Sequence, residues 1–198
     1  MPSFVSYPPI ATKYFYYREN GIRTGICIHY SGELKKSNYL KTIIDLINTL
    51  VPNRVFLLNF RDNVSLITGK NVDSEIVTYD SYTFETISEL YSMCKLAIIP
   101  EKNGTFEGVP IEAIASGVPV VAPQLSSLLV IKEILKNNHI SEDQCFDLNR
   151  AEPDLVTNWL ISVEPKMKNI SKIVGSSFDP KTIMKSFLEN LTGNTSVP

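Results

Sequence analysis

The sequence contains little of what several common protein classes require. It has three cysteines, two histidines and one tryptophan among 198 residues. Cys27, Cys94 and Cys145 are odd in number, far apart and without C-x-x-C spacing. Neither a disulfide framework nor a zinc site is therefore predicted. We expect reduced cysteines that pack in the core, and no bound metal.

An excess of charge of either sign is also absent. The chain has 19 Lys plus Arg and 21 Asp plus Glu, which gives a formal net charge of -2. Such a balance lacks the basic footprint of a nucleic-acid-binding protein. No apolar run approaches the roughly 20 residues that span a bilayer, and the N-terminus lacks the pattern of a signal peptide. We expect no nucleic-acid partner, no integral membrane segment and a cytoplasmic location.

Apolar strands alternate with amphipathic helices through most of the chain. Strands are expected at residues 24–30, 54–60, 75–79, 96–100, 118–122 and 145–148. The pattern predicts one α/β domain with a Rossmann-like, doubly wound, mostly parallel sheet covered by helices on both faces. Within this single domain of residues 1–198, we interpret 1–20 as an N-terminal arm or linker and 151–198 as C-terminal helices.

The segment PEKNGTFEGVPIEAIASGVPVVAP, residues 100–123, is the most informative. A buried strand leads into a loop with two glycines, and a helix expected to begin at Pro110 carries Glu112 in its first turn. The free amides and positive dipole of such a helix start bind anions such as phosphate. A carboxylate beside them suits neutral hydroxyls, such as a ribose diol. Spacing alone leaves open the alternative that Glu112 only caps its own helix.

The stretch EGVPIEAIASGVPVVAP resembles the signature of the retaining GT-B glycosyltransferases of family 4 and their glycogen-synthase-like relatives. HYSGELKKSNYLKTIIDLINTL and YDSYTFETISELYSMCKLAIIP extend the resemblance over residues 24–123, and FDPKTIMKSFLENL resembles the family's closing helix. The resemblance implies the carboxyl-terminal, nucleotide-sugar-binding half of a GT-B enzyme. Such an enzyme transfers a sugar from a UDP-sugar or GDP-sugar with retention and without a metal; the acceptor is unknown.

The resemblance also implies roles for individual residues. Glu112 is expected to hold the donor ribose, and the turn from Thr105 to Val109 the diphosphate. Lys35 or Lys36 would neutralise phosphate charge, although solvated lysines on an exposed turn are the alternative. The candidate binding residues are Gly32, Lys35, Lys36, Ser81, Thr105, Phe106, Gly108, Val109 and Glu112, and the candidate catalytic residues are Glu107 and Lys36.

Two residues depart from the family's pattern. Gly104 stands where the family has the first glutamate of its E-x7-E motif, which leaves Glu101 or Glu107 as substitutes. Glu33 stands where the family has an arginine beside the diphosphate, and at an effective dielectric of about 20 this charge reversal means that Glu33 must either point away or weaken donor binding. These departures keep open an inactive nucleotide-sugar-binding regulatory or assembly subunit. An epimerase half is a further alternative.

A complete GT-B site lies between two halves, and this sequence accounts for one of them. We therefore expect a homodimer, a separate partner that carries the N-terminal domain, a large open acceptor, or a chain that does not catalyse. The apolar face of Ile183, Phe187 and Leu191 is expected to pack on its own domain or to form that contact. His29 has no partner at a useful sequence spacing, so it is interpreted as structural.

Overall fold

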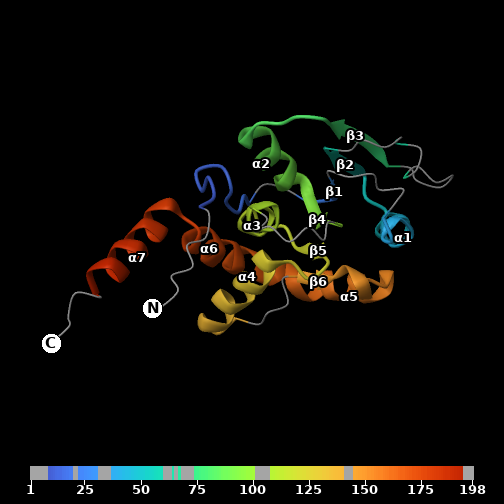
Figure 1. The fold of residues 1–198 in the computed structure, drawn as a ribbon. Coiled ribbons are helices and arrows are strands. Elements are labelled where there is room, and N and C mark those ends of the chain that lie inside the picture. Colours follow the sequence, from blue (N-terminus) through green and yellow to red (C-terminus); the bar gives the residue numbers. More distant parts are fainter. Residues whose placement is uncertain are drawn as a thin grey trace.

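A parallel sheet of six strands forms the centre of the computed structural model (Figure 1). The structure describes residues 9–19, 22–30, 37–59, 64, 67, 74–100, 108–140 and 145–193, without the side chains of 187 and 190–193. The strand order is β3-β2-β1-β4-β5-β6, and every pairing is parallel. The strands are β1 (Gly25–His29), β2 (Arg54–Leu58), β3 (Glu75–Tyr79), β4 (Cys94–Ile98), β5 (Val120–Ala122) and β6 (Cys145–Asp147).

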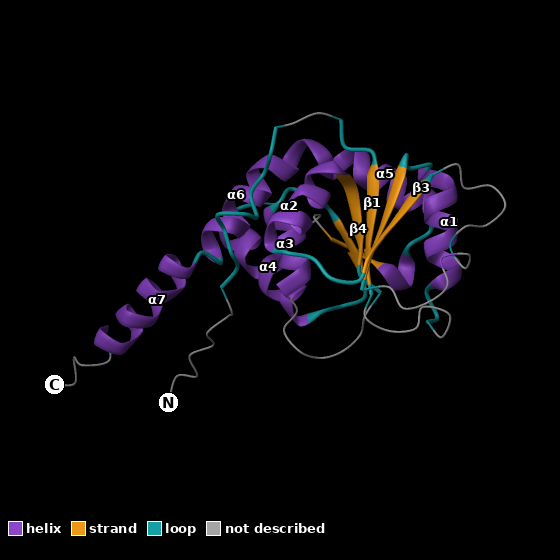
Figure 2. Cartoon of the chain, turned by 90° about the horizontal axis from the view of Figure 1, so that it is seen from above, coloured by secondary structure: helices purple, strands orange, loops and turns teal. Residues whose placement is uncertain are grey.

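Helices cover both faces of this sheet, as the sequence predicts. One face packs against α2, α3, α4 and α6, and the other against α1 and α5 (Figure 2). Alternate strand residues enter two separate cores: Cys27 belongs to the first and Ile26 and Ile28 to the second. The helices are α1 (Leu40–Leu50), α2 (Phe84–Met93), α3 (Gly108–Ala115), α4 (Ser126–Asn137), α5 (Pro153–Val163), α6 (Met167–Ser177) and α7 (Pro180–Gly193), with short 3-10 turns η3 (Leu148–Arg150) and η4 (Glu164–Lys166).

Several element boundaries differ by one or two residues from the sequence prediction, among them the starts of α3 and β4. Helix α3 begins at Gly108 and not at Pro110. Proline is tolerated as the third helical residue because the first four backbone amides of a helix have no partner within it. Strand β4 begins at Cys94 and not at Leu96, since α2 ends at Met93 and the chain enters the strand without a loop.

The N-terminal segment 9–19 packs into the domain. Phe15 is buried in the first core, where its ring contacts those of Phe84 and Tyr91. The Arg18 guanidinium donates to Ser88 on α2. At the other end of the chain, α7 projects away from the body (Figures 1 and 2) and exposes Met184 and Leu188.

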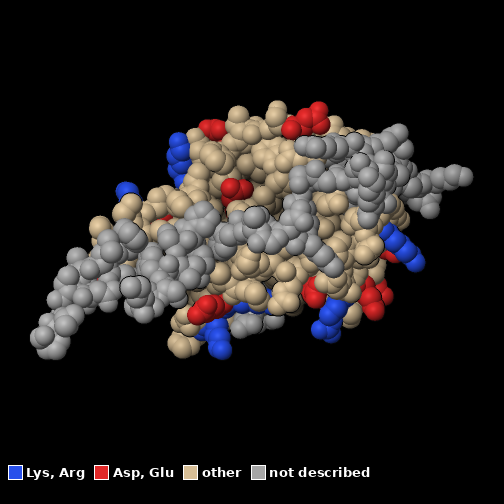
Figure 3. Space-filling view, viewed as in Figure 1, with Lys and Arg blue, Asp and Glu red and all other residues tan. Residues whose placement is uncertain are grey.

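On the side shown in Figure 3, acidic and basic side chains lie singly or in small mixed groups, mostly near the rim. Among the described residues, no helix combines the length and the apolar composition needed to cross a membrane. Cys27 and Cys94 are buried and Cys145 is half-buried, and all three are free thiols.

The C-terminal end of α3 is fixed by a glycine and an arginine. Gly117 has a φ of 79°, and its amide donates to Ile114 while that of Val118 donates to Ala113, which closes the helix as a Schellman motif. The Arg23 guanidinium donates to the carbonyl oxygens of Gly117 at 2.9 Å and Ser116 at 3.0 Å. A side chain at position 117 would overlap the Tyr17 ring.

Replacing this glycine should therefore destabilise the domain. We expect Gly117→Ala to lower the free energy of unfolding by at least about 2 kcal/mol, because alanine is strained at positive φ and collides with Tyr17. Gly175→Ala, inside α6 with open space around it, is the matched control and should raise stability by about 0.5–1 kcal/mol. Urea unfolding measures both, and equal effects would contradict the prediction.

Candidate functional site

The strand order reverses between β1 and β4, where this fold class is expected to form a ligand crevice. The chain runs outward from β1 to β3 and then returns to β4 on the other side of β1. Connections leave such a switch point on opposite faces and open a crevice at the carboxyl ends of the strands, where open α/β sheets bind ligands. Helix α3 follows β4 and begins beside this crevice, so its N-terminal amides face the ligand position expected for the fold.

Glu112 is the acidic residue of α3. Its carboxylate folds back toward the start of the helix, since a Cβ at Gly108 would lie 3.8 Å from its Oε1 atom. No described residue forms a hydrogen bond or an ion pair with this carboxylate. Burial raises the pKa of Glu112 to about 7. A helix N-terminus alone would lower that pKa, so loss of hydration is the larger effect here.

A second polar group near Glu112, the Tyr91 hydroxyl, lies in the first core. The Tyr91 hydroxyl on α2 is fully buried and has no hydrogen-bond partner among the described residues. Burial raises its pKa well above the usual value, and the neighbouring Cys27 and Glu112 contribute. This hydroxyl cannot carry charge at neutral pH. Among the described residues, no cation compensates the ionised form of Glu112.

Three side chains meet at the carboxyl ends of β1 and β2 and just after β3. His29 Nε2 lies 3.0 Å from Asn59 Nδ2 and 2.9 Å from the Tyr82 hydroxyl. Asn59 Nδ2 also donates to the Tyr82 hydroxyl at 3.3 Å. The cluster fixes the connection after β3 against the end of β1. Strand β1 is the direct neighbour of β4 in the sheet.

Sequence reasoning missed Asn59 and gave His29 no partner. The available signal was position, because Asn59 directly follows a buried parallel strand, where polar side chains reach the sheet edge. Its φ of 55° is also one that asparagine tolerates better than most residues. The partners of His29 are 30 and 53 residues away, so only the tertiary fold brings them together.

The structure describes only some of the predicted site residues, and it places them at different parts of the sheet edge. Gly108 and Val109 are half-buried in the first turn of α3, one turn before Glu112. Ser81 is exposed after the edge strand β3, and its neighbour Tyr82 is the residue that contacts His29. The remaining predicted residues lie outside the described part of the chain: Gly32, Lys35, Lys36, Thr105, Phe106 and Glu107, together with Glu33 and Gly104.

The described site can accept hydrogen bonds and attract an anion. Glu112 offers two carboxylate oxygens to hydroxyl donors, and the N-terminal amides of α3 offer donors to an anionic group. Among the described residues, no group of three or more His, Cys, Asp and Glu side chains is arranged to hold a metal ion. The absence of a metal from the chemistry stays a prediction.

Comparisons with known proteins identify the fold. Sucrose-phosphate synthase from Thermosynechococcus elongatus is similar over 95% of this chain and 52% of its own, at 18% sequence identity and a TM-score of 0.65. A glycosyltransferase from Rickettsia africae is similar over 98% of this chain and 58% of its own, at 13% identity and a TM-score of 0.65. The catalytic domain of starch synthase IV from Arabidopsis thaliana, solved with ADP and acarbose, is similar over 94% of this chain and 41% of its own, at 16% identity and a TM-score of 0.54.

The chain therefore has the α/β, Rossmann-like fold found in these GT-B glycosyltransferases. It spans about half the length of the first two structures, 52% and 58%. No protein-family model matches the chain, and no curated protein matches its sequence. At these identities the likeness establishes the fold alone.

The raised pKa of Glu112 predicts a specific pH dependence of stability. Because the pKa rises from 4.5 in the unfolded chain to about 7 in the folded one, the folded state binds more protons between these values. Stability contributed by this group is therefore lost as the pH rises through that window. We expect Glu112→Gln to be more stable than the wild type by about 3 kcal/mol at pH 8, with most of the difference gone at pH 5.

Urea unfolding at the two pH values measures this difference. Glu133→Gln, at an exposed position of α4, is the matched control and should change stability little at either pH. A stability difference for Glu112→Gln that is independent of pH would show that the carboxylate is hydrated in the folded state.

Proposed function

We propose that this domain binds the nucleotide-diphosphate sugar of a glycosyltransferase in the crevice between β1 and β4. The observation that carries the proposal is the carboxylate of Glu112, which is held beside the start of α3 with no partner among the described residues. The fold, shared with structures that include a sucrose-phosphate synthase and a starch synthase solved with ADP, supports the same assignment.

Glu112 would accept hydrogen bonds from the ribose hydroxyls. Hydroxyl donors restore the stabilisation that the carboxylate loses on burial, and bonds to a charged acceptor contribute on the order of 1.5–3 kcal/mol. A buried, uncompensated carboxylate repels a phosphate but suits a neutral diol. The ribose and the diphosphate would therefore take separate positions along the same helix.

The diphosphate would lie at the amides of Gly108 and Val109. These residues open α3, where unpaired N–H groups and the helix dipole favour negative charge. Stabilising the departing nucleotide diphosphate is then the main electrostatic contribution to sugar transfer, made without a metal. In this proposal transfer proceeds with retention, Lys36 would neutralise charge on the departing phosphate, and Glu107 would act on the transferred sugar.

Titration calorimetry with UDP-sugars and GDP-sugars tests donor binding. We expect one of the two nucleotide classes to bind, and Glu112→Ala to weaken that binding by about tenfold or more. Glu133→Ala serves as the control, because Glu133 lies on the exposed face of α4. If neither class of donor produces heat with the wild type, the proposal is wrong.

The affinity should also depend on pH through Glu112. Ribose hydroxyls favour the ionised carboxylate, whose pKa is about 7 without ligand. We therefore expect the affinity for a nucleotide sugar to fall by up to about tenfold per unit as the pH decreases below 7. The Glu112→Gln variant should bind weakly at every pH. A wild-type affinity that stays constant from pH 5 to pH 8 would contradict the assigned role.

A further inference from the structure

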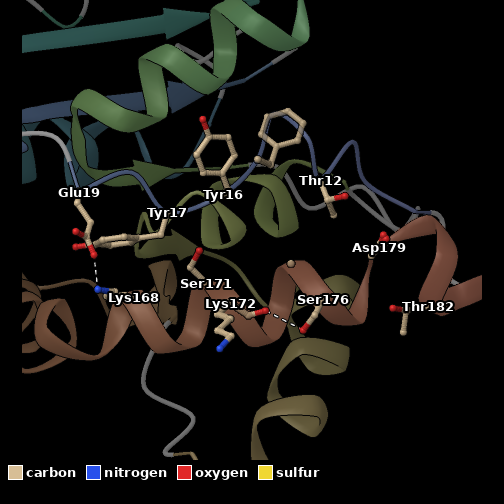
Figure 4. A pocket seen from close by; sticks show the side chains of 12 residues that line it. Thr12, Tyr16, Tyr17, Glu19, Lys168, Ser171, Lys172, Ser176, Asp179 and Thr182 are labelled. Atoms are coloured by element: carbon tan, nitrogen blue, oxygen red, sulfur yellow. Dashed lines mark hydrogen bonds and ion pairs between the residues drawn. The ribbon is translucent and has the colours of Figure 1, made fainter.

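A second cavity, of about 470 Å³, lies between the N-terminal segment and α6 (Figure 4). The N-terminal segment and α6 form the two walls of this cavity, and their chains run in opposite directions. The Ile10 amide donates to the Phe178 carbonyl at one end, and Glu19 forms an ion pair with Lys168 at the other. The cavity has the volume of a small-molecule site, for which about 300–1,000 Å³ is typical. None of the residues that line it belongs to the crevice at Glu112.

Aromatic rings form the wall contributed by the N-terminal segment. Tyr16 is 50% exposed, and the Arg18 guanidinium stacks over its ring at 5.2 Å from the centroid. Arg18 is itself bonded to Ser88 on α2, so the ring is held in place before any ligand arrives. Tyr17 is fixed in the same way by Arg23, whose guanidinium lies 5.0 Å from its ring centroid.

Polar groups with free hydrogen-bonding capacity gather at one end. Figure 4 shows Thr12, Asp179 and Thr182 together beyond the aromatic residues. Their side chains form no hydrogen bond with any described residue. Glu19 and Lys168 neutralise each other at the opposite end, and the lining also includes one further base, Lys172, besides Asp179. This balance of two acids and two bases does not favour an anionic ligand.

Gly175 keeps the floor of the cavity open. It lies in the interior of α6, where glycine is the least favourable residue apart from proline. Nothing described lies within 4 Å of the position that a Cβ would take, and its φ does not require glycine. Packing therefore gives no reason for a glycine here, whereas a longer side chain would enter the cavity.

We propose that this cavity is a binding site for a neutral saccharide, separate from the nucleotide site. A sugar ring packs its C–H face on an aromatic ring, as Tyr16 offers, and its hydroxyls donate to a carboxylate and exchange hydrogen bonds with hydroxyl groups, as Asp179, Thr12 and Thr182 offer. An apolar peptide would leave these polar groups unsatisfied, and a phosphorylated ligand would meet Asp179.

Saturation-transfer NMR with the full chain tests the proposal. The probes are neutral hexasaccharides of glucose, mannose and galactose. We expect at least one of them to bind, Gly175→Leu to abolish the signal by filling the cavity, and Asp179→Asn to weaken binding by about tenfold. Gly175→Ala, which adds only a methyl group, should bind nearly as the wild type does. The melting temperature of Gly175→Leu should equal or exceed that of the wild type, because leucine favours the helix.

Each other outcome would overturn the proposal. The proposal is wrong if no neutral hexasaccharide gives a signal, or if Gly175→Leu still binds the hexasaccharide that the wild type binds. It is also wrong if only sulfated or phosphorylated glycans bind. A change of mass in light scattering on Gly175→Leu would assign the cavity to a protein contact. Nucleotide-sugar binding measured on the same samples is a separate readout, so failure of the saccharide site is distinguishable from failure of the donor site.

Discussion

The enclosure of α3 between the sheet and α6 is the constraint on which the rest of the structure depends. Ala113 and Ala115 are fully buried and keep the helix thin, and the Ser171 hydroxyl of α6 donates to the Ala115 carbonyl. Gly117 and Arg23 fix the C-terminal end of this helix. Its N-terminal end thereby lies at the ligand position expected beside β1, and Glu112 is only partly exposed to solvent.

This enclosure explains why one carboxylate has unusual properties. A helix start next to a switch point attracts anions in many α/β proteins, so the position alone does not distinguish one ligand from another. The partial burial of Glu112 adds a distinction between ligands, because loss of hydration without a described partner raises the pKa of this carboxylate to about 7. A ligand that brings both an anion and neighbouring hydroxyls satisfies the helix start and the carboxylate together.

The order of strands and helices could be predicted because it follows from local periodicity. The apolar run at β2 and the helical pattern of α1 are legible in any window of that length. The start of α3 was misplaced because Pro110 is compatible with more than one position in a first turn. The cluster of His29, Asn59 and Tyr82 was not predictable, since it joins three strand ends that only the sheet order brings together. The resemblance had selected Glu112, but its burial could not be read from the sequence.

Binding of UDP or GDP compared with the corresponding 2′,3′-dideoxynucleoside diphosphate tests the central claim most directly. If Glu112 holds the ribose hydroxyls, their removal should weaken binding to the wild type by about tenfold or more and have almost no effect on Glu112→Ala. Such a coupled loss would assign the hydroxyls to this carboxylate. An equal loss in both proteins, or none in either, would contradict it.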